Sequence, residues 1–233
     1  MPDISVVLPT YNEREHIADL IAAIRAALPT DTEVIVVDDD SPDGTWQAVE
    51  SYAGRHAGVI LLRRIGRRGL TSALNEGIAL ARGRVICWMD CDFSMPPDTL
   101  PQLVEATERA DLAIGSRYVR GGVDRGHSFL ARVFSRTING FAGVVLGFYV
   151  HDFTSGFIAS RRGVLEAITL CGDYGEYFID LMARARKMGF TVAEIPYTCA
   201  PRRSGESKTG TSLGGYLRRG SKYVMTVVRL RFS

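Results

Sequence analysis

Residues 84–92 read Arg84-Val85-Ile86-Cys87-Trp88-Met89-Asp90-Cys91-Asp92, an apolar run that ends in two carboxylates. The run is short, β-branched and aromatic, which is typical of a buried strand. In alternating α/β sheets, ligands bind just beyond the carboxyl ends of the strands. Mg²⁺ and Mn²⁺ prefer oxygen ligands, and Mg²⁺ commonly joins carboxylates to substrate phosphates. We therefore expect Asp90 and Asp92 to hold a divalent metal against a diphosphate; the alternative is a helix cap or a solvated turn.

The first half of the chain alternates such runs with helical patterns. The strands we expect are Ile4–Leu8, Glu33–Val37, Val59–Leu62, Arg84–Met89 and Asp111–Gly115. The helices we expect are Arg14–Ala27, Gly44–Arg55, Leu70–Ala81 and one that opens at Pro97. Strands separated by helices predict a Rossmann-like α/β fold, with a mainly parallel sheet, right-handed crossovers and flanking helices.

In the second half of the chain, strands and helices no longer alternate regularly. Residues 116–153 are rich in glycine, arginine and aromatic residues and predict a loop that feeds an interfacial helix. The elements expected after it are a strand at Thr154–Ser160, helices at Arg161–Thr169 and Glu176–Met188, and a strand at Val192–Tyr197. Because no repeat or flexible linker interrupts the pattern, we expect one continuous domain over residues 1–233.

The charge of the chain is unevenly distributed. The whole chain carries a formal +2, but residues 201–233 hold eight basic residues and one acid, which leaves −5 for residues 1–200. This asymmetry favours an anionic partner for the C-terminal segment. Residues 213–232 also place apolar side chains near helical spacing, so the segment predicts either a helix docked on the sheet or a basic amphipathic helix on an anionic membrane. Aromatic residues do not accompany the charges as a stacking platform would require, so we expect no nucleic-acid binding.

The cysteines and the apolar runs bear on the compartment. The four cysteines show neither a C-x-x-C pair nor zinc spacing, which predicts reduced thiols in a cytosolic protein. The N-terminus lacks the basic and apolar regions of a signal peptide. The longest apolar run, Phe141–Val150, is half the length of a spanning helix, so we expect no membrane crossing.

Three strand ends carry polar groups, and they converge on one edge of the expected sheet. These groups are Thr10, Tyr11 and Glu13 after the first strand, Asp38, Asp39 and Asp40 after the second, and Asp90 and Asp92 after the fourth. Ser41 and Asp43 suit a helix cap and turn, but three consecutive aspartates exceed what a cap requires. In dinucleotide-binding folds, acidic residues at strand ends bind the ribose or the base of the nucleotide. The first strand is followed by neither G-x-G-x-x-G nor a Walker loop, which excludes the common NAD and P-loop classes.

Several segments together resemble a known family. Val7–Glu13, Val37–Thr45 and Met89–Asp92 are similar to the signature segments of family 2 glycosyltransferases with the GT-A fold. Ile114–Tyr118, Thr154–Phe157 and Arg202–Lys208 resemble the dolichyl-phosphate mannose synthase branch, which moves a sugar from a nucleotide to a polyprenyl phosphate. The resemblance covers nearly the whole chain. It implies a nucleotide-sugar-binding half at residues 1–115 and an acceptor-binding half at residues 116–233.

The resemblance also implies roles at the matching positions. Pro9, Tyr11, Glu13, Val37, Asp39 and Asp90 would bind the nucleotide; Asp90 and Asp92 would hold Mg²⁺ or Mn²⁺; Arg117, Arg132, Ser135 and Arg202 would bind the acceptor phosphate; and Asp90, Asp92, Arg117 and Arg202 would be catalytic. Two positions depart from the pattern. Ser94 stands where a metal-binding glutamine is common, and Ala131 stands where an arginine is common. Arg132 or Arg136 could substitute for the latter.

A lipid phosphate is already anionic near neutral pH and needs no strong general base, and the sequence shows no Ser-His-Asp or Cys-His arrangement. A metal and arginines would stabilise the departing diphosphate by fixed charge. Of the four histidines, three are expected at the surface or in loops, and His151, beside Asp152, is the candidate for a place near the site. The resemblance thus implies inverting, metal-dependent transfer of mannose from GDP-mannose to a polyprenyl phosphate, on the cytoplasmic face of a membrane, with or without an anchor subunit.

Three other functions stay open at this point. The donor could be UDP-glucose or another UDP-sugar. The acceptor could be a saccharide, which would need a general base, and Asp152 and Asp180 are the candidates. The chain could also be a non-catalytic nucleotide-sugar-binding subunit, although such a protein would need neither the metal pair nor the acceptor arginines.

Overall fold

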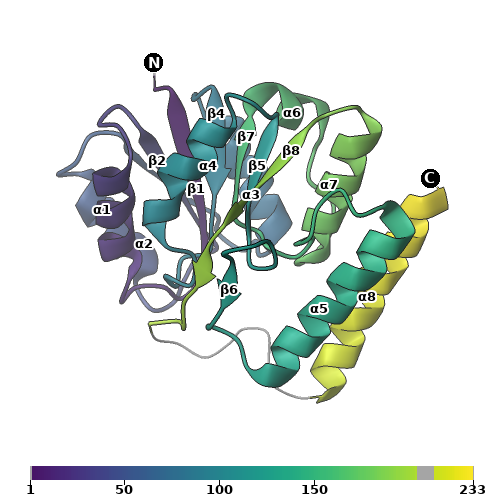
Figure 1. Ribbon diagram of the computed structural model, residues 1–233. Helices are drawn as coiled ribbons and strands as arrows, with labels where there is room; N and C mark the ends of the chain where they lie inside the picture. The colour runs from purple at the N-terminus through teal and green to yellow at the C-terminus, as the bar shows by residue number, and fades with distance from the viewer. Residues whose placement is uncertain (1, 204–212, 233) are drawn as a thin grey trace.

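The computed structural model describes residues 2–203 and 213–232 (Figure 1). In chain order, the strands are β1 (Ile4–Thr10), β2 (Glu33–Asp38), β3 (Val59–Arg63), β4 (Val85–Trp88), β5 (Leu112–Ser116), β6 (Val123–Asp124), β7 (Ile158–Arg161), β8 (Val192–Pro196) and β9 (Thr198–Cys199). The helices are α1 (Ile17–Ala27), α2 (Thr45–Ala53), α3 (Leu70–Leu80), the 3₁₀ turn η1 (Pro97–Thr99), α4 (Leu100–Ala106), α5 (Phe129–Leu146), α6 (Arg162–Ala167), α7 (Glu176–Lys187) and α8 (Leu213–Phe232).

Seven strands form one sheet in the order β3-β2-β1-β4-β7-β5-β8. All neighbours run parallel except β7, which is antiparallel to both β4 and β5. The prediction of a mainly parallel α/β sheet is therefore confirmed, and β7 is a reversal that the alternation of strands and helices did not indicate. The carboxyl ends of the parallel strands point toward the end of the molecule from which α5 and α8 extend (Figure 1).

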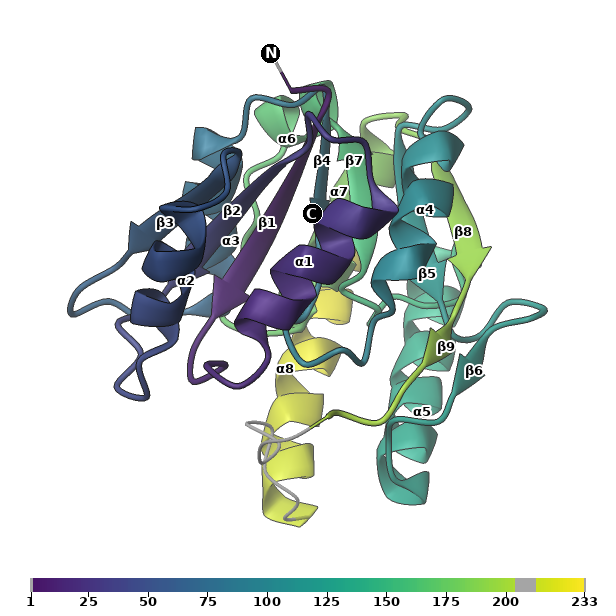
Figure 2. The same ribbon diagram turned by 90° about the vertical axis from the view of Figure 1, so that its left-hand side faces the viewer.

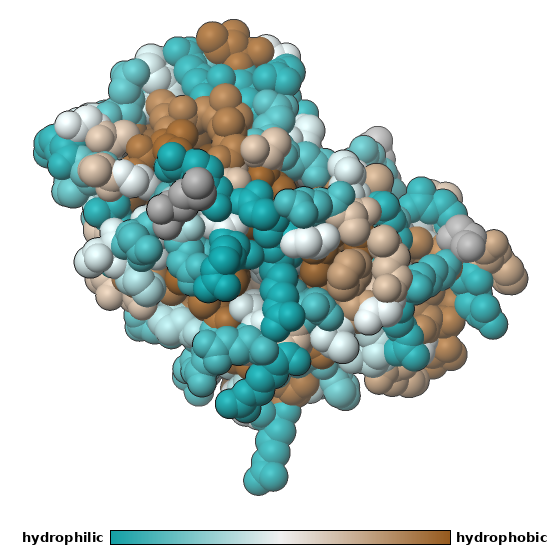
Figure 3. All heavy atoms as spheres, turned by 90° about the horizontal axis from the view of Figure 1, so that it is seen from above, coloured by the Kyte–Doolittle hydropathy of each residue, from teal (hydrophilic) through white to brown (hydrophobic). Residues whose placement is uncertain are grey.

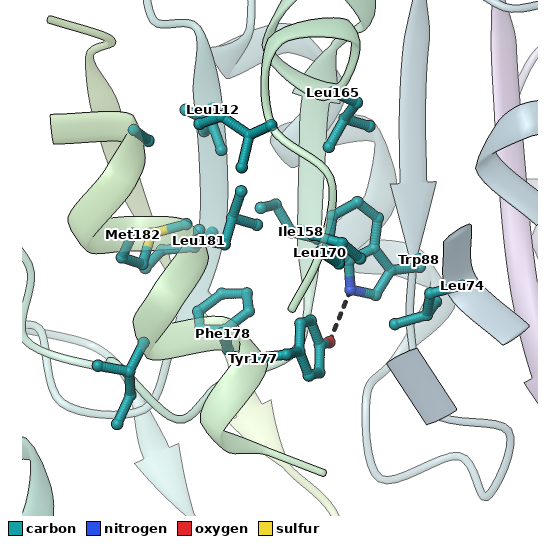
Figure 4. Close-up of a cluster of buried hydrophobic side chains, with 14 of the residues drawn as sticks. Leu74, Trp88, Leu112, Ile158, Leu165, Leu170, Tyr177, Phe178, Leu181 and Met182 are labelled. Atoms are coloured by element: carbon teal, nitrogen blue, oxygen red, sulfur yellow. Dashed lines mark hydrogen bonds between the residues drawn. The ribbon is translucent and has the colours of Figure 1, made fainter. Parts of the chain in front are cut away.

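Helices cover both faces of the sheet, and each face has its own core. Apolar side chains of α1, α2 and α4 form one core, and those of α3, α5, α6, α7 and α8 form the other. The second core is locked by Trp88 on β4, whose indole Nε1 donates to the hydroxyl of Tyr177 on α7 at 2.9 Å (Figure 4). Gly77 lets α3 approach the sheet closely, because a Cβ there would lie 2.4 Å from Cγ1 of Val7. The tight packing places the strand ends and the N-terminus of α7 beside each other.

Two elements differ from expectation at their starts. The strand expected from Thr154 begins only at Ile158, because Gly156 turns the backbone with a φ of 73°. The first helix begins at Ile17 rather than Arg14, after a turn in which the carbonyl of Glu13 accepts from the N–H groups of His16 and Ile17.

Residues 116–153 contain more regular structure than a loop. Strand β6 pairs with β9 in a separate two-stranded sheet, and α5 follows it for 18 residues. Among the described residues, α5 alone is long and apolar enough to cross a membrane by length and composition, and the run Phe141–Val150 overlaps its second half. Soluble proteins contain helices of this kind too, so α5 does not by itself establish a span.

The C-terminal helix α8 packs against both α5 and α7 (Figure 2). Val227 and Leu230 are buried in the core, whereas Met225 is 62% exposed and Val228 43%. The helix is therefore docked on the protein, but on α5 and α7 rather than on the sheet as one of the two predictions had it, and it keeps apolar side chains open to solvent. Most of the Arg202–Lys208 motif and the side chains of Leu213 and Leu217 lie outside the described residues.

Candidate active site

Two neighbouring cavities lie at the carboxyl ends of the parallel strands. The first, of about 170 Å³, is called here the strand-end cavity; it is lined by Pro9, Thr10, Tyr11, Glu13, Asp39, Leu70, Ala73, Asp90, Cys91, Asp92, Tyr174 and Arg202. The second, of about 230 Å³, is called the α5 cavity; it is lined by Asp90, Arg117, His127, Ala131, Ser135, Thr154, Tyr177 and Arg202, together with Leu70, Phe134, Ile138, Ser155, Gly156, Tyr174, Gly175, Phe178, Gly220 and Tyr223. Asp90 and Arg202 lie in the walls of both.

The two carboxylates after β4 have different surroundings. Asp92 is buried; its carboxylate accepts from the backbone N–H of Ser94 at 2.9 Å and forms an ion pair with Arg202, whose Nε lies 3.0 Å away. The side chain of Asp90 is exposed to both cavities, although the surrounding protein displaces part of the water around it. Burial, reinforced by the neighbouring Asp92 carboxylate, raises the pKa of Asp90 to about 6, while Arg202 opposes the rise.

A divalent cation fits this pair. Two carboxylates held close together repel each other, and the raised pKa of Asp90 records that cost. A hard cation between them would favour the ionised form of both, and carboxylate oxygens are the ligands that Mg²⁺ and Mn²⁺ prefer. Ser94, which stands in place of the common glutamine, contributes its backbone N–H to Asp92.

The three aspartates after β2 divide into one cavity residue and two structural ones. Asp38 is fully buried and accepts from Oγ1 of Thr10 at 2.9 Å and from the backbone N–H and hydroxyl of Ser41. Asp40 pairs with Arg63, whose Nε lies 2.7 Å from the carboxylate. Only Asp39 of the three lines the strand-end cavity.

Asp39 is tied to the loop that precedes α3. Its carboxylate accepts from the backbone N–H of Gly69 at 2.8 Å and lies 3.0 Å from Nε of the buried Arg64. Burial raises the pKa of Asp39, although these two partners work in the opposite direction. The strand-end cavity thus presents, besides Asp90 and Asp92, a third carboxylate that is held in a fixed orientation, which suits a ribose or a base.

Val37 differs from the other residues expected to bind nucleotide. Its side chain is fully buried in β2 and packs against α3 at Gly77. It lines neither of the two cavities. Pro9, Tyr11 and Glu13, by contrast, all line the strand-end cavity, and the guanidinium of Arg68 stacks 4.1 Å from the Tyr11 ring centre.

Arg117 reaches the α5 cavity from the end of β5. Its Nε and Nη2 donate to the two oxygens of Asp152 at 2.8 and 2.7 Å, and Nη2 also donates to Oγ1 of Thr154. Burial opposes the charged guanidinium, but Asp152 outweighs it and holds the pKa of Arg117 above its usual range. Ser135 on α5 lies within 3.1 Å of Thr154 Oγ1, so Arg117 and Ser135 share one polar wall.

The structure does not bring Arg132 into this wall. Its Nη1 donates to the backbone carbonyl of Asp124 at 3.2 Å, and Ala131 lines the α5 cavity instead. Arg136 lies over the ring of Tyr118 and lines a different hollow. On a helix, adjacent residues point about 100° apart, so a cation at 132 cannot take the direction of one at 131.

The histidine at the site is His127 rather than His151. His151 is exposed and pairs with Glu194 at 2.7 Å, whereas His127 lines the α5 cavity and pairs with Asp124 at 3.0 Å. The hydrogen bond to Asp124, followed by the contact with Cys199, raises the pKa of His127 to about 9. The Asp-x-x-His spacing just before an amphipathic helix was the available signal in the sequence.

Both candidate general bases are engaged in ion pairs. Asp152 is fully buried beneath Arg117, and Asp180 lies 3.0 Å from Arg229 and 3.5 Å from Arg184 on the α7–α8 side. Neither arrangement leaves a carboxylate poised to accept a proton from a sugar hydroxyl.

A sheet of this topology, with a carboxylate pair at the carboxyl end of β4 and polar groups at the ends of β1 and β2, is typical of a glycosyltransferase with the GT-A fold. Residues 5–169 match the model of glycosyl transferase family 2, and the chain belongs to this family.

Relatives of known function agree with this membership. The chain is 36% identical over 220 residues to a dolichol-phosphate mannosyltransferase of Pyrococcus furiosus, over 92% of this chain and 62% of that protein. It is 40% identical over 215 residues to a polyprenol monophosphomannose synthase of Mycolicibacterium smegmatis, over 89% of this chain and 81% of the relative.

The fold is likewise similar to that of a solved structure. Glucosyl-3-phosphoglycerate synthase from Mycobacterium tuberculosis, in complex with Mn²⁺, UDP and glucosyl-3-phosphoglycerate, superposes with a TM-score of 0.73 at 22% identity, over 98% of this chain and 80% of that one. The chain is a glycosyltransferase with the GT-A-like fold.

Proposed function

We propose that the chain transfers mannose from GDP-mannose to the phosphate of a polyprenyl phosphate, with a divalent metal. The observation that carries this proposal is the pair of cavities that share Asp90 and Arg202. A nucleotide diphosphate in the strand-end cavity would meet an acceptor phosphate in the α5 cavity at these two residues. The mannosyltransferase names of the relatives support both the sugar and the lipid acceptor.

The residues of each cavity suit the two anions differently. Asp90 and Asp92 would hold Mg²⁺ or Mn²⁺, which would neutralise the diphosphate as it leaves. Asp39, Tyr11 and Glu13 would hold the nucleoside. Arg117, Ser135 and Arg202 would bind the acceptor phosphate; arginine suits this role because its planar fork matches phosphate oxygens.

The reaction proposed is a single displacement. An oxygen of the acceptor phosphate forms the bond to the anomeric carbon, and the bond from that carbon to the donor diphosphate breaks, so that the nucleoside diphosphate leaves with the electron pair. The phosphate oxygen carries no proton to remove, which agrees with the absence of an unpaired base at Asp152 and Asp180. Attack opposite the leaving group inverts the anomeric centre. Retention in the product would contradict this mechanism.

The surface beside the α5 cavity suits a membrane that supplies the lipid. At the start of α5, Phe129 is 75% exposed, and Leu130 and Val133 are each 44% exposed. This end of α5 lies on the side to which the strand carboxyl ends point (Figure 1). The opposite end, seen from above, is mostly hydrophilic with separate hydrophobic patches (Figure 3). We place the chain on the cytoplasmic face of a membrane, with the tip of α5 in contact with lipid.

A transfer assay tests the function directly. The protein is incubated with a polyprenyl phosphate and Mn²⁺, and with radiolabelled GDP-mannose or UDP-glucose in separate reactions. We expect label to reach the organic phase from GDP-mannose. Label from UDP-glucose instead would correct the donor, and failure of every nucleotide sugar to give lipid-linked label would overturn the proposal.

A further inference from the structure

His127 presents one ring nitrogen to the α5 cavity and uses the other to hold its position. Nδ1 lies 3.0 and 3.1 Å from the two carboxylate oxygens of Asp124, and the backbone N–H of His127 donates to the same carboxylate at 3.1 Å. The ring is 42% exposed and lies in the wall that also holds Arg117, Ser135 and Arg202. In the described part of the chain, Nε2 has no hydrogen-bond partner, so it is the nitrogen left for a ligand.

The charges around the ring favour its protonated form. Asp124 faces the ring from β6, and the carboxylate of Asp124 also lies 3.6 Å from Nη1 of Arg117. Cys199 faces the ring from β9, with its sulfur 3.8 Å from Nδ1. The carboxylate of Asp90, across the cavity, favours the protonated ring, and the guanidinium of Arg117 disfavours it. Asp124 and Asp152 both pair with Arg117, and their two charges exceed its single charge, so a neutral His127 would leave this group of side chains net negative. The pKa of about 9 agrees with an imidazolium at neutral pH.

The same three side chains could in principle hold a metal. Ligand atoms of Asp124, His127 and Cys199 all lie within 4.8 Å of one another. The buried guanidinium of Arg117 lies against this group through Asp124, and it repels the double charge of a divalent ion more strongly than the single charge of an imidazolium at the same place. The geometry is therefore better explained by a carboxylate that bridges two cations.

We propose that His127 donates from Nε2 to the phosphate of the acceptor, with Asp124 as the residue that positions its ring. This inference rests on the proposed function. Ala131, one helical turn further along, presents only a methyl group to the cavity, which leaves room for a phosphate beside the imidazole. The acceptor phosphate is thereby bound by two arginines and a histidine, and its binding acquires a pH dependence that arginines alone would not confer.

Kinetics of three variants test the assignment. A hydrogen bond to a charged group contributes about 1.5–3 kcal/mol, which corresponds to roughly a 10- to 100-fold change. We expect His127→Gln to raise the KM for farnesyl phosphate by at least about tenfold and to leave the KM for the nucleotide sugar within about twofold. His127→Arg should restore most of the lost affinity. His151→Gln removes an exposed histidine that is also paired with a carboxylate, and it should change neither KM.

The pH profile separates binding from a structural role. In the wild type, kcat/KM for farnesyl phosphate should fall as pH rises through about 9, and this limb should be absent from His127→Gln. An unchanged acceptor KM in His127→Gln, while the wild type transfers sugar, overturns the assignment and leaves the proposed function intact.

Two further results would be decisive. If the wild type transfers no sugar, calorimetric titration with farnesyl phosphate still tests the inference, and equal affinities of the wild type and His127→Gln overturn it. A near-ultraviolet Co²⁺–thiolate band that disappears in Cys199→Ser would show a metal site at His127 and would also overturn it.

Discussion

The strand-end cavity and the α5 cavity share Asp90 and Arg202, yet they are built from different kinds of contact. The first takes most of its polar wall from turns that directly follow β1, β2 and β4, so that Glu13, Asp39, Asp90 and Asp92 each lie within a few residues of a buried strand. The second joins the end of β5, the β6–α5 loop, α5 and α7. Its ion pairs connect residues far apart in the chain, such as Arg117 with Asp152.

This difference has a consequence for stability. Asp39 and Asp92, the two buried carboxylates of the strand-end cavity, each accept from a backbone N–H group as well as facing an arginine, so neither depends on an ion pair alone. In the α5 cavity, the buried guanidinium of Arg117 depends on the carboxylate of Asp152 to balance its charge. Substitutions in the first cavity should therefore impair chemistry alone, and substitutions in the second should impair both chemistry and folding.

The largest effect is expected at Asp92. Asp92→Asn keeps the size of the side chain and can still accept from the N–H of Ser94, but it removes a charge from the metal pair. Loss of a metal ligand and of electrostatic stabilisation should lower kcat by about 10³-fold or more. The measurement is steady-state transfer alongside thermal unfolding, which should stay close to that of the wild type.

Asp98→Asn is the matched control for Asp92, because Asp98 is an exposed acid a few residues further on. It should keep activity within about twofold. Wild-type activity in Asp92→Asn would reject the metal assignment.

The next effect concerns the buried ion pair of the α5 cavity. Asp152→Asn leaves the guanidinium of Arg117 buried without its carboxylate, and breaking a buried pair in this way costs about 3–5 kcal/mol. Urea denaturation should show a loss of unfolding free energy of that order. Asp40→Asn breaks a pair in which both side chains are about a third exposed, and it should cost less than about 1 kcal/mol. Equal losses in the two variants would contradict the view that folding depends on the buried Arg117–Asp152 pair.

The same contrast explains how far the sequence could predict the site. The positions of Asp39, Asp90 and Asp92 follow from strand alternation, because the end of a parallel strand is also the edge of the sheet. Arg117 was expected at the site from its motif, but its ion pair with Asp152 depends on how β5 packs against the turn before β7. The antiparallel β7 itself is set by packing between segments, and its sequence differs little from that of a parallel strand.

Arg132 and His127 show a finer limit. Which face of α5 meets the cavity depends on how the helix packs against α8, so the sequence near residue 131 did not indicate that Arg132 points away. His127 was expected on the surface because its partners Asp124 and Cys199 come together only through the β6–β9 pair. A small sheet formed by segments more than 70 residues apart leaves almost no local pattern.

A third prediction tests where the α5 cavity meets the lipid. Replacing Phe129 and Leu130 by Ser removes exposed apolar surface from the tip of α5. Transfer of such side chains out of water is worth about 1.5–3 kcal/mol each when complete, so binding to anionic phospholipid vesicles should fall at least tenfold. Sedimentation with vesicles measures this.

The matched control for the α5 tip is Ile65→Ser, which removes an apolar side chain that is 70% exposed on the β3–α3 connection. It should bind vesicles as the wild type does. Equal loss of binding in both would show that the tip of α5 is not the contact.

The smallest effect is the pH dependence that His127 gives to stability. Its pKa in the folded chain is about 9, against about 6.5 for an ordinary histidine, so folding favours the protonated ring. The stabilisation is fully present below pH 6.5 and is lost as pH rises through about 9. Because the ring is more than a third exposed, screening by solvent limits the gain to about 1 kcal/mol.

The free energy of unfolding of the wild type, measured relative to His127→Gln from pH 6 to 10, should therefore be larger at the acidic end and converge above pH 9. Asp124 faces the ring directly, and it stays ionised throughout this range because His127 and Arg117 lower its pKa. Convergence in this range would assign the effect to the imidazolium. A difference that is constant with pH would mean that His127 stabilises the β6–α5 loop by packing alone, and the α5 cavity would then rely on its two arginines for positive charge.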